Sequence, residues 1–216
     1  MRPAVLGLVA AVAMSAACGG SGDPGLRDAL PSMVPSEEQA ADFLGISSDV
    51  WEVKEVVGEY VSNELAAERG QGPVGTETAA ELEEMGRVTG YLSSHSVELG
   101  RRGWSLMVYL DLYRDDESAS AAMKQMPHWY DYDPFPLDGW GDEAIAMPAQ
   151  GGVRPDGSRG TCYGGCPFRF RVGPVVGHVS EGHALPVPTF DQQTEEAVAR
   201  WVIERIEDEL SARGEA

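Results

Sequence analysis

The sequence predicts an α+β domain: an antiparallel sheet of about five to six strands with covering helices, including a long C-terminal helix. Two observations support this fold class. Two pairs of strand-like segments each flank a short turn sequence, which is typical of antiparallel hairpins. Residues 190–213 repeat apolar side chains at helical spacing. Runs of strands with a few helices are typical of α+β domains. The expected hairpin strands are residues 87–98, 103–113, 168–172 and 175–179.

The first hairpin is the clearest part of the predicted sheet. Its strands are separated by the turn sequence Leu99-Gly100-Arg101-Arg102. In the second strand, apolar residues alternate with other types, and a period of two places one face of a strand in the core. The apolar positions are Trp104, Leu106, Val108, Leu110 and Leu112, and the alternating ones are Ser105, Met107, Tyr109 and Asp111. The second hairpin is expected to turn at Gly173-Pro174.

The C-terminal helix is expected to pack on this sheet through an apolar stripe. The stripe consists of Ala197, Val198, Trp201, Val202, Ile206 and Leu210. Trp201 lies at its centre, so its ring is expected to be buried against the sheet. The opposite side is expected to face water and consists of Glu195, Glu196, Arg205, Glu207 and Glu209.

Shorter elements complete the domain. Ser36 and Gln39 have the spacing of a capping box, so a short helix is expected to start there and to end at Gly45. Acidic residues at 115–117 suit the start of another helix because they interact with the positive end of its dipole. Further helices are expected at residues 63–69, 78–85 and 115–126, and further strands at 50–57 and 143–147.

The amino terminus has the three parts of an export signal. Arg2 supplies a positive charge, residues 4–14 are uncharged and largely apolar, and Ser15-Ala16-Ala17 supplies small residues before Cys18. The apolar run has about eleven residues, whereas a membrane-spanning helix needs roughly twenty. The sequence therefore predicts a cleaved signal peptide.

Ala16-Ala17-Cys18 resembles the bacterial lipobox, although Ser15 stands where that family usually has an aliphatic residue. The resemblance implies that Cys18 becomes the first residue of the mature chain and carries a diacylglyceryl group and fatty acyl chains such as palmitate. The alternative is an ordinary secretory signal that leaves Cys18 as a thiol. We expect a signal peptide at residues 1–17, a lipid-anchor cysteine and flexible tether at 18–35, and a single extracytoplasmic domain at 36–216.

The charge of the chain excludes some partners. Its 35 acidic and 16 basic residues give a formal net charge of -19. Such a surface repels the phosphates of nucleic acids, so no nucleic-acid partner is expected. The 43% of hydrophobic residues are enough for a sizeable core.

Cys162 and Cys166 flank a short glycine-containing loop. Outside the cytoplasm, two such cysteines usually pair, so a disulfide is expected. The alternative is a zinc site, because His178 and His183 follow at a spacing close to a Cys2His2 pattern. Glycines precede both histidines and no amphipathic helix carries them, which favours the disulfide. We expect no metal and no cofactor.

Residues 128–136 are rich in aromatic and acidic side chains and form the candidate ligand-binding segment. Rings can stack on a sugar or a cation, and carboxylates can supply charge. The alternative is that the rings cover a sheet edge and pack into the core. The candidate ligand-binding residues are Trp129, Tyr130, Tyr132 and Trp140.

No motif specifies a reaction. The four histidines, His95, His128, His178 and His183, are not placed beside a nucleophile by any sequence spacing. The order of elements resembles uncharacterised exported lipoprotein domains and sensor-type domains of bacteria. We therefore expect a non-catalytic domain at the cell membrane or outer membrane that binds a ligand or an envelope partner. An envelope hydrolase or a metal-binding protein is the alternative.

Overall fold

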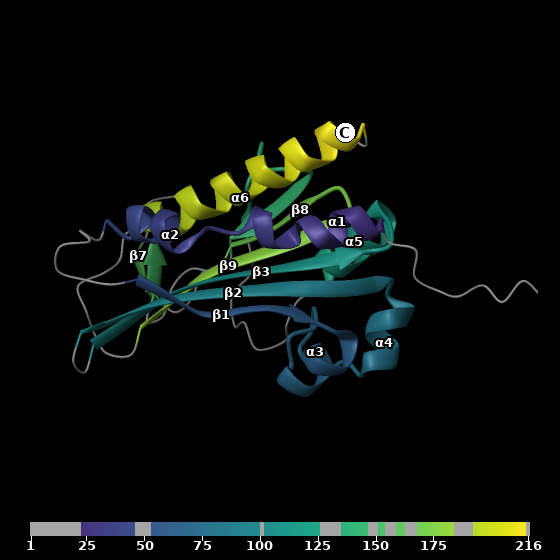
Figure 1. Cartoon of the computed structure of the whole chain (residues 1–216), viewed down its shortest axis with the longest axis horizontal. Helices are drawn as coiled ribbons and strands as arrows, with labels where there is room; N and C mark the ends of the chain where they lie inside the picture. The colour runs from purple at the N-terminus through teal and green to yellow at the C-terminus, as the bar shows by residue number, and fades with distance from the viewer. Residues whose placement is uncertain are drawn as a thin grey trace, which may run out of the picture.

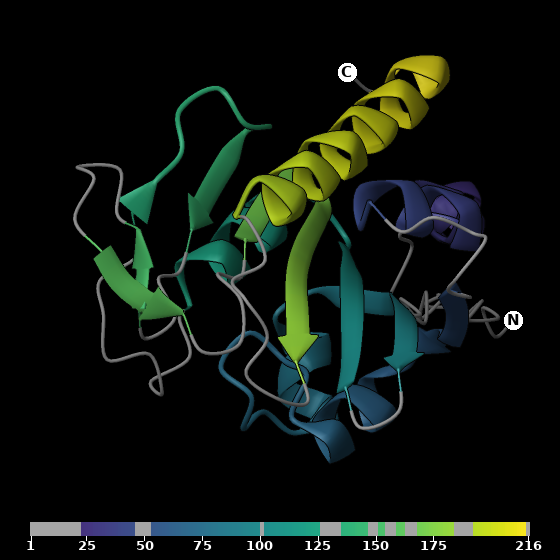
Figure 2. The ribbon, with the colours of Figure 1, turned by 90° about the vertical axis from the view of Figure 1, so that its left-hand side faces the viewer.

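The fold is that of a computed structural model, which describes residues 23–45, 53–99, 102–125, 135–146, 151–153, 159–162, 168–183 and 192–214. Within these residues, seven strands form one antiparallel sheet in the order β1-β2-β3-β9-β8-β5-β4. Figures 1 and 2 show its long central strands with helices on both sides. The predicted fold class, including the long C-terminal helix, is confirmed.

Both predicted hairpins are present. β2 (Arg87–Leu99) and β3 (Arg102–Tyr113) pair along their whole length, and β8 (Phe168–Val172) pairs with β9 (Val175–His183) across the Gly173-Pro174 turn. Because β3 also pairs with β9, the two hairpins join into the centre of the sheet. The remaining strands of this sheet are β1 (Val53–Val61), β4 (Phe135–Pro136) and β5 (Glu143–Ala146).

A separate two-stranded sheet lies in a glycine-rich part of the chain. It consists of β6 (Gly151–Val153) and β7 (Arg159–Cys162).

The helices divide between the two faces of the large sheet (Figure 1). The face covered by α6 (Gln192–Arg213) is called the core face, and the opposite one the polar face. Their contacts place the N-terminal helices on the core face, together with α6. Three other short helices lie on the polar face. Beside α6 lie α1 (Pro24–Ala29), the 3-10 helix η1 (Leu30–Met33) and α2 (Glu37–Phe43). On the polar face lie α3 (Asn63–Arg69), α4 (Ala79–Glu84) and α5 (Asp116–Lys124).

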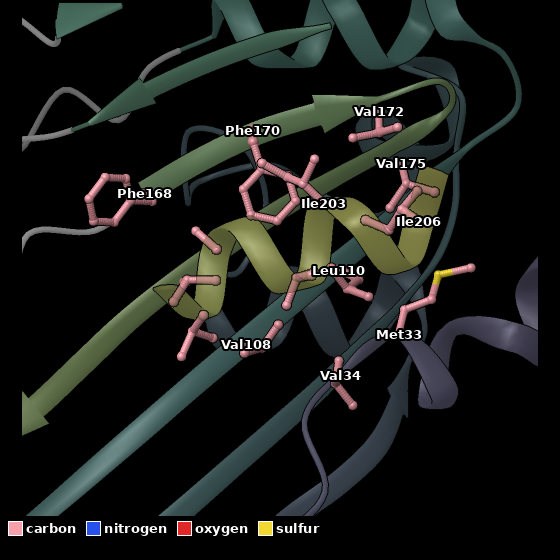
Figure 3. Packing of buried hydrophobic residues seen from close by; sticks show 14 of the residues in the cluster. Met33, Val34, Val108, Leu110, Phe168, Phe170, Val172, Val175, Ile203 and Ile206 are labelled. Carbon is pink, nitrogen blue, oxygen red and sulfur yellow. The ribbon is translucent and has the colours of Figure 1, made fainter. Parts of the chain in front are cut away.

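The main hydrophobic core lies between α6 and the core face (Figure 3). The alternating apolar residues of β3 contribute Leu106, Val108 and Leu110, all fully buried as predicted. Phe170 of β8 lies against Gly177 of the next strand, where an added Cβ would come within 2.2 Å of the ring. A side chain at this glycine would therefore displace the phenylalanine from the core.

The contacts of α6 correct part of the predicted stripe. Val198, Val202, Ile206 and Leu210 are buried, together with Ala199 and Ile203, so the stripe is rotated from the predicted position. Three further predictions on this helix are wrong: Trp201 is only half-buried, Ala197 is exposed, and Glu195 is buried. The ring of Trp201 packs edge-on against Phe43 of α2, with a centroid distance of 6.1 Å, instead of on the sheet.

The folded domain begins before residue 36, which corrects the predicted extent of the tether. Asp23 caps α1 by accepting a hydrogen bond from the Gly25 N–H at 3.0 Å. Leu26 and Leu30 are fully buried in the main core, so this segment is part of the fold. The predicted signal peptide, Cys18 and residues 19–22 lie outside the described residues.

Candidate functional site

The polar face carries a row of polar side chains that runs across three central strands. Tyr109 of β3 is the register partner of His178 on β9, and His178 is the partner of Arg169 on β8. Cross-strand partners point to the same side of a sheet, so all three side chains lie on the polar face. Asp111 and Tyr113 follow Tyr109 on the same side of β3. This row is the candidate functional site.

A complete ion-pair network forms one end of the row. The Arg87 guanidinium is fully buried and donates to Asp111 Oδ1 at 2.7 Å, to Tyr109 Oη at 2.7 Å and to Asn63 Oδ1 at 2.6 Å. It also donates to the carbonyl oxygen of Val61 at 3.2 Å. Burial disfavours the charge, but the adjacent Asp111 carboxylate raises the pKa of Arg87 above its ordinary value. The network joins β1, β2, β3 and α3, so its role is structural.

Arg169 fixes the end of α5 on the same face. Its Nη1 donates to the carbonyl oxygen of Gln125 at 2.9 Å, and its Nη2 donates to that of Ala122 at 3.0 Å. The last carbonyls of a helix lack intrahelical partners and carry partial negative charge, so a guanidinium stabilises them. Arg169 thereby holds the start of the segment that follows Gln125, which contains the predicted ligand-binding residues.

His178 has an unused hydrogen-bonding atom. Its residue is half-buried, yet its Nε2 is shielded from solvent and has no hydrogen-bond partner among the described residues. Burial, with a contribution from the charge of Arg169, lowers the pKa of His178 to about 4. The imidazole is therefore neutral at pH 7, with one ring nitrogen as donor and the other as acceptor.

Beside His178, on the side toward Ser180, the polar face is half-buried and uncharged. Ser94 of β2, Met107 of β3 and Ser180 of β9 are consecutive register partners, one step beyond the row of Tyr109 and His178. All three are half-buried. Hydroxyl groups and an adaptable thioether therefore adjoin the imidazole, an arrangement that suits a neutral polar ligand.

Trp140 is the only predicted ligand-binding residue that lies among the described residues, and its ring is occupied by protein. It is buried and stacks on Phe168, with 5.6 Å between the ring centroids and an interplanar angle of 7°. The Arg200 guanidinium of α6 lies 3.9 Å from the ring centroid. Trp140 therefore helps to join β8 to α6, on the opposite side of the sheet from His178.

The other predicted aromatic residues, Trp129, Tyr130 and Tyr132, lie outside the described residues, as does His128. In the sequence, Trp129 is four residues after Gln125, whose carbonyl oxygen accepts a hydrogen bond from Arg169.

The disulfide and its zinc alternative both remain predictions. Cys162 is the last residue of β7, and Cys166 lies outside the described residues. His183 ends β9, whereas His178 lies within that strand. The described part of the chain holds no group of three or more His, Cys, Asp or Glu side chains arranged to bind a metal ion.

A depression of about 290 Å³ lies between α6 and the adjacent η1 and α2. It is lined by Ser32, Gln39, Trp201, Arg205, Asp208 and Glu209. The Arg205 guanidinium lies 5.1 Å from the centroid of the Trp201 ring, so part of the aromatic surface is already covered. The depression is open to solvent.

Sequence reasoning missed the importance of Arg87, Asp111 and Arg169. Asp111 was expected on the side of β3 opposite the core, and it does lie on that side. Helices cover this side of the sheet as well, so Asp111 is buried. The sequence did contain a signal for the buried ion pair. Asp111 is a charged residue within a strongly apolar strand, and Arg87 is the first residue of the strand that pairs with it.

Comparisons with known proteins do not assign a family. No family model matches the chain, and no curated protein matches it. Among solved structures, the chain is similar to the crystal structure of the extracellular domain of PknH from Mycobacterium tuberculosis. The sequence identity is 10%, the TM-score is 0.49, and the match covers 84% of this chain and 96% of that one. No helix among the described residues has the length and apolar character that a membrane crossing requires.

Proposed function

We propose that this chain is a lipid-anchored, extracytoplasmic, non-catalytic domain that binds a polar ligand or an envelope partner on the polar face of its sheet. The main support for this binding site is that the Nε2 atom of His178 is shielded from solvent and has no hydrogen-bond partner within the described ranges. Buried polar atoms in folded proteins are nearly always hydrogen-bonded, so a ligand group is a suitable partner for this atom.

The lipid anchor is supported by Ala16-Ala17-Cys18 and the apolar run before it. In cells that process lipoproteins, Cys18→Ser removes the only thiol in this motif. Wild type is expected in the detergent phase after phase separation, and the variant is expected in the aqueous phase or unprocessed. Equal partitioning of both proteins into the aqueous phase would overturn the anchor.

The ligand is expected to be neutral and to offer hydrogen-bond donors and acceptors. His178 is neutral at pH 7, and the adjoining strip of Ser94, Met107 and Ser180 carries no charge. The charged groups nearby, Arg87 and Arg169, are hydrogen-bonded to other groups of the protein and so serve to position the strands and α5. Sugars, amides and alcohols have the required chemistry.

A ligand-observed NMR screen tests this site. The probes are small sugars, amides and alcohols, mixed with wild type, with His178→Phe and with the control Glu204→Gln, which changes an exposed residue of α6. Loss of one buried hydrogen bond is expected to weaken binding by about tenfold or more in His178→Phe. Glu204→Gln is expected to bind as wild type does. The absence of any binding probe, or equal binding by all three proteins, would contradict the proposal.

The proposal includes a disulfide between Cys162 and Cys166, because an extracytoplasmic domain folds in an oxidising compartment. Protein purified without reductant is expected to show neither cysteine alkylated when it is denatured and treated with a thiol reagent. Alkylation of both cysteines together with bound zinc would favour the metal-binding alternative instead, with His178 or His183 as ligands.

A further inference from the structure

The first described residue is bound to the end of the last helix. Arg213, in the last turn of α6, donates through Nη1 to Asp23 Oδ2 at 2.6 Å and through Nη2 to the carbonyl oxygen of Gly25 at 3.0 Å. Its Nε donates to Glu209 on the preceding turn at 2.9 Å. The guanidinium is thereby oriented from its own helix toward the start of α1.

Burial holds the same segment independently of this ion pair. Leu26, Leu30 and Met33 are each almost fully buried in the main core. The chain from Asp23 onward is consequently fixed to α6 and does not act as a linker.

We infer that the lipid anchor holds one end of the domain, where α1 begins and α6 ends, against the bilayer. The partner of this end of the domain is therefore a lipid surface. This inference rests on the proposed lipid anchor at Cys18. Four residues separate Cys18 from Asp23. Five Cα–Cα steps span at most about 18 Å when fully extended. Asp23, to which the end of α6 is bound, therefore stays within that distance of the lipidated Cys18.

The same geometry places the rest of the domain farther out. α6 contains 22 residues, and its C-terminal end lies beside α1 in Figure 1. The end of β2 and the start of β3 lie at the opposite end of the long strands (Figure 1). Since a helix rises about 1.5 Å per residue, Ala197 lies roughly 22 Å from Ala212 along α6. The formal charge of -19 gives no attraction to anionic headgroups, so the short connection alone sets the position.

Energy transfer from two positions of one helix tests the inference. A fluorescent unnatural amino acid replaces Ala212 or, in the matched variant, Ala197; both residues are exposed, and Cys18, Cys162 and Cys166 stay unchanged. The lipidated proteins are reconstituted into phosphatidylcholine vesicles that contain an acceptor attached to a headgroup. Transfer is expected to be about twofold or more higher from position 212 than from position 197, because of the roughly 22 Å between them.

A longer connection provides the control. An insertion of about 20 Gly and Ser residues after Gly22 gives the connection a root-mean-square span of roughly 27 Å, so the difference between the two positions is expected to shrink. Vesicle flotation with equal transfer from both positions, or with a difference that the insertion leaves unchanged, would overturn this inference and leave the anchor intact. A failure of the wild type to float with vesicles would overturn the anchor, and this inference with it.

Discussion

At the scale of single residues, the buried polar groups of the polar face differ in how fully their hydrogen bonds are satisfied. The Arg87 guanidinium has four acceptors, one of which is the Asp111 carboxylate. Burying two charges costs free energy, so such a pair is stable only while both partners remain. His178 lies on the same face with Nε2 unused among the described residues. The first group therefore holds strands together, whereas the second can serve a ligand.

Removal of one partner of the network is predicted to destabilise the fold strongly. Arg87→Ala leaves Asp111 as a buried carboxylate without its cation, and such losses cost about 3–5 kcal/mol. Urea denaturation is the measurement. Arg114→Ala is the control, since Arg114 is exposed and its nearest carboxylate, on Asp115, is 3.8 Å away; we expect a change below about 0.5 kcal/mol.

The apolar double variant Arg87→Met with Asp111→Leu separates loss of the pair from loss of packing. It removes both charges, so it is expected to lose less stability than Arg87→Ala alone. If Arg87→Ala were as stable as Arg114→Ala, the guanidinium would not be buried as described.

The neutral imidazole of His178 predicts a pH dependence of stability. Burial lowers the pKa of His178 from 6.5 to about 4 in the folded state. Between these values the unfolded state binds the proton and the folded state does not, so stability falls as the pH decreases from about 6.5 to about 4. His178→Leu is expected to lack this contribution. Urea midpoints of both proteins at several pH values give the difference, and parallel profiles would contradict it.

At the scale of elements, the secondary structure was predictable where a periodic pattern and a stop signal coincide. The period of two in residues 104–112 predicted β3, and the helix expected at residues 63–69 matches α3, which ends at Gly70 with a positive φ of 64°. β4 and β6 have only two and three residues, too few to show a period. The sequence did contain a local signal for the start of α1. Asp is a common N-cap residue and Pro is common in the first turn of a helix, so Asp23 followed by Pro24 indicates a helix start.

The orientation of α6 needed the tertiary structure. The apolar residues around Trp201 allow the helix to be rotated by part of a turn, and large aromatic rings are easily accommodated at a margin where one edge contacts water. The structure places Ile203 and Ile206 toward the sheet and leaves Trp201 beside α2. Helical periodicity thus predicted the helix and only approximately its buried side.

Three substitutions on α6 test this orientation. Ile206→Ala removes a fully buried side chain and is expected to cost about 2–5 kcal/mol. Trp201→Ala is expected to cost less, about 1–2 kcal/mol, because part of the side chain is already exposed. Arg205→Ala is expected to cost about 0.5–1 kcal/mol through the lost contact with the Trp201 ring. Guanidinium denaturation measures all three, and a larger loss for Trp201→Ala than for Ile206→Ala would restore the predicted orientation.

At the scale of the whole molecule, the candidate site was less predictable than the fold. The aromatic segment was selected by composition, which does not determine the side of the sheet on which each ring lies; Trp140 lies on the core face with Phe168. His178 was considered as a metal ligand because of its spacing from the cysteines. Its role depends on Tyr109 and Arg169, which lie 69 and 9 residues away in the sequence and meet it only through strand pairing.

The boundary of the folded domain gives the most demanding test of the whole molecule. The sequence predicted a flexible tether up to residue 35, whereas the structure buries Leu26, Leu30, Met33 and Val34 in the main core. Together these side chains contribute about 6–12 kcal/mol of stabilisation, as much as the whole stability of a typical domain. A chain that starts at Ser36 is therefore expected not to fold. A chain that starts at Asp23 retains both the burial and the Arg213 ion pair, so it is expected to unfold cooperatively. Proton NMR dispersion and urea denaturation of the two proteins decide between a tether and an integral part of the core, and a cooperative transition in the shorter chain would show that residues 24–34 are dispensable.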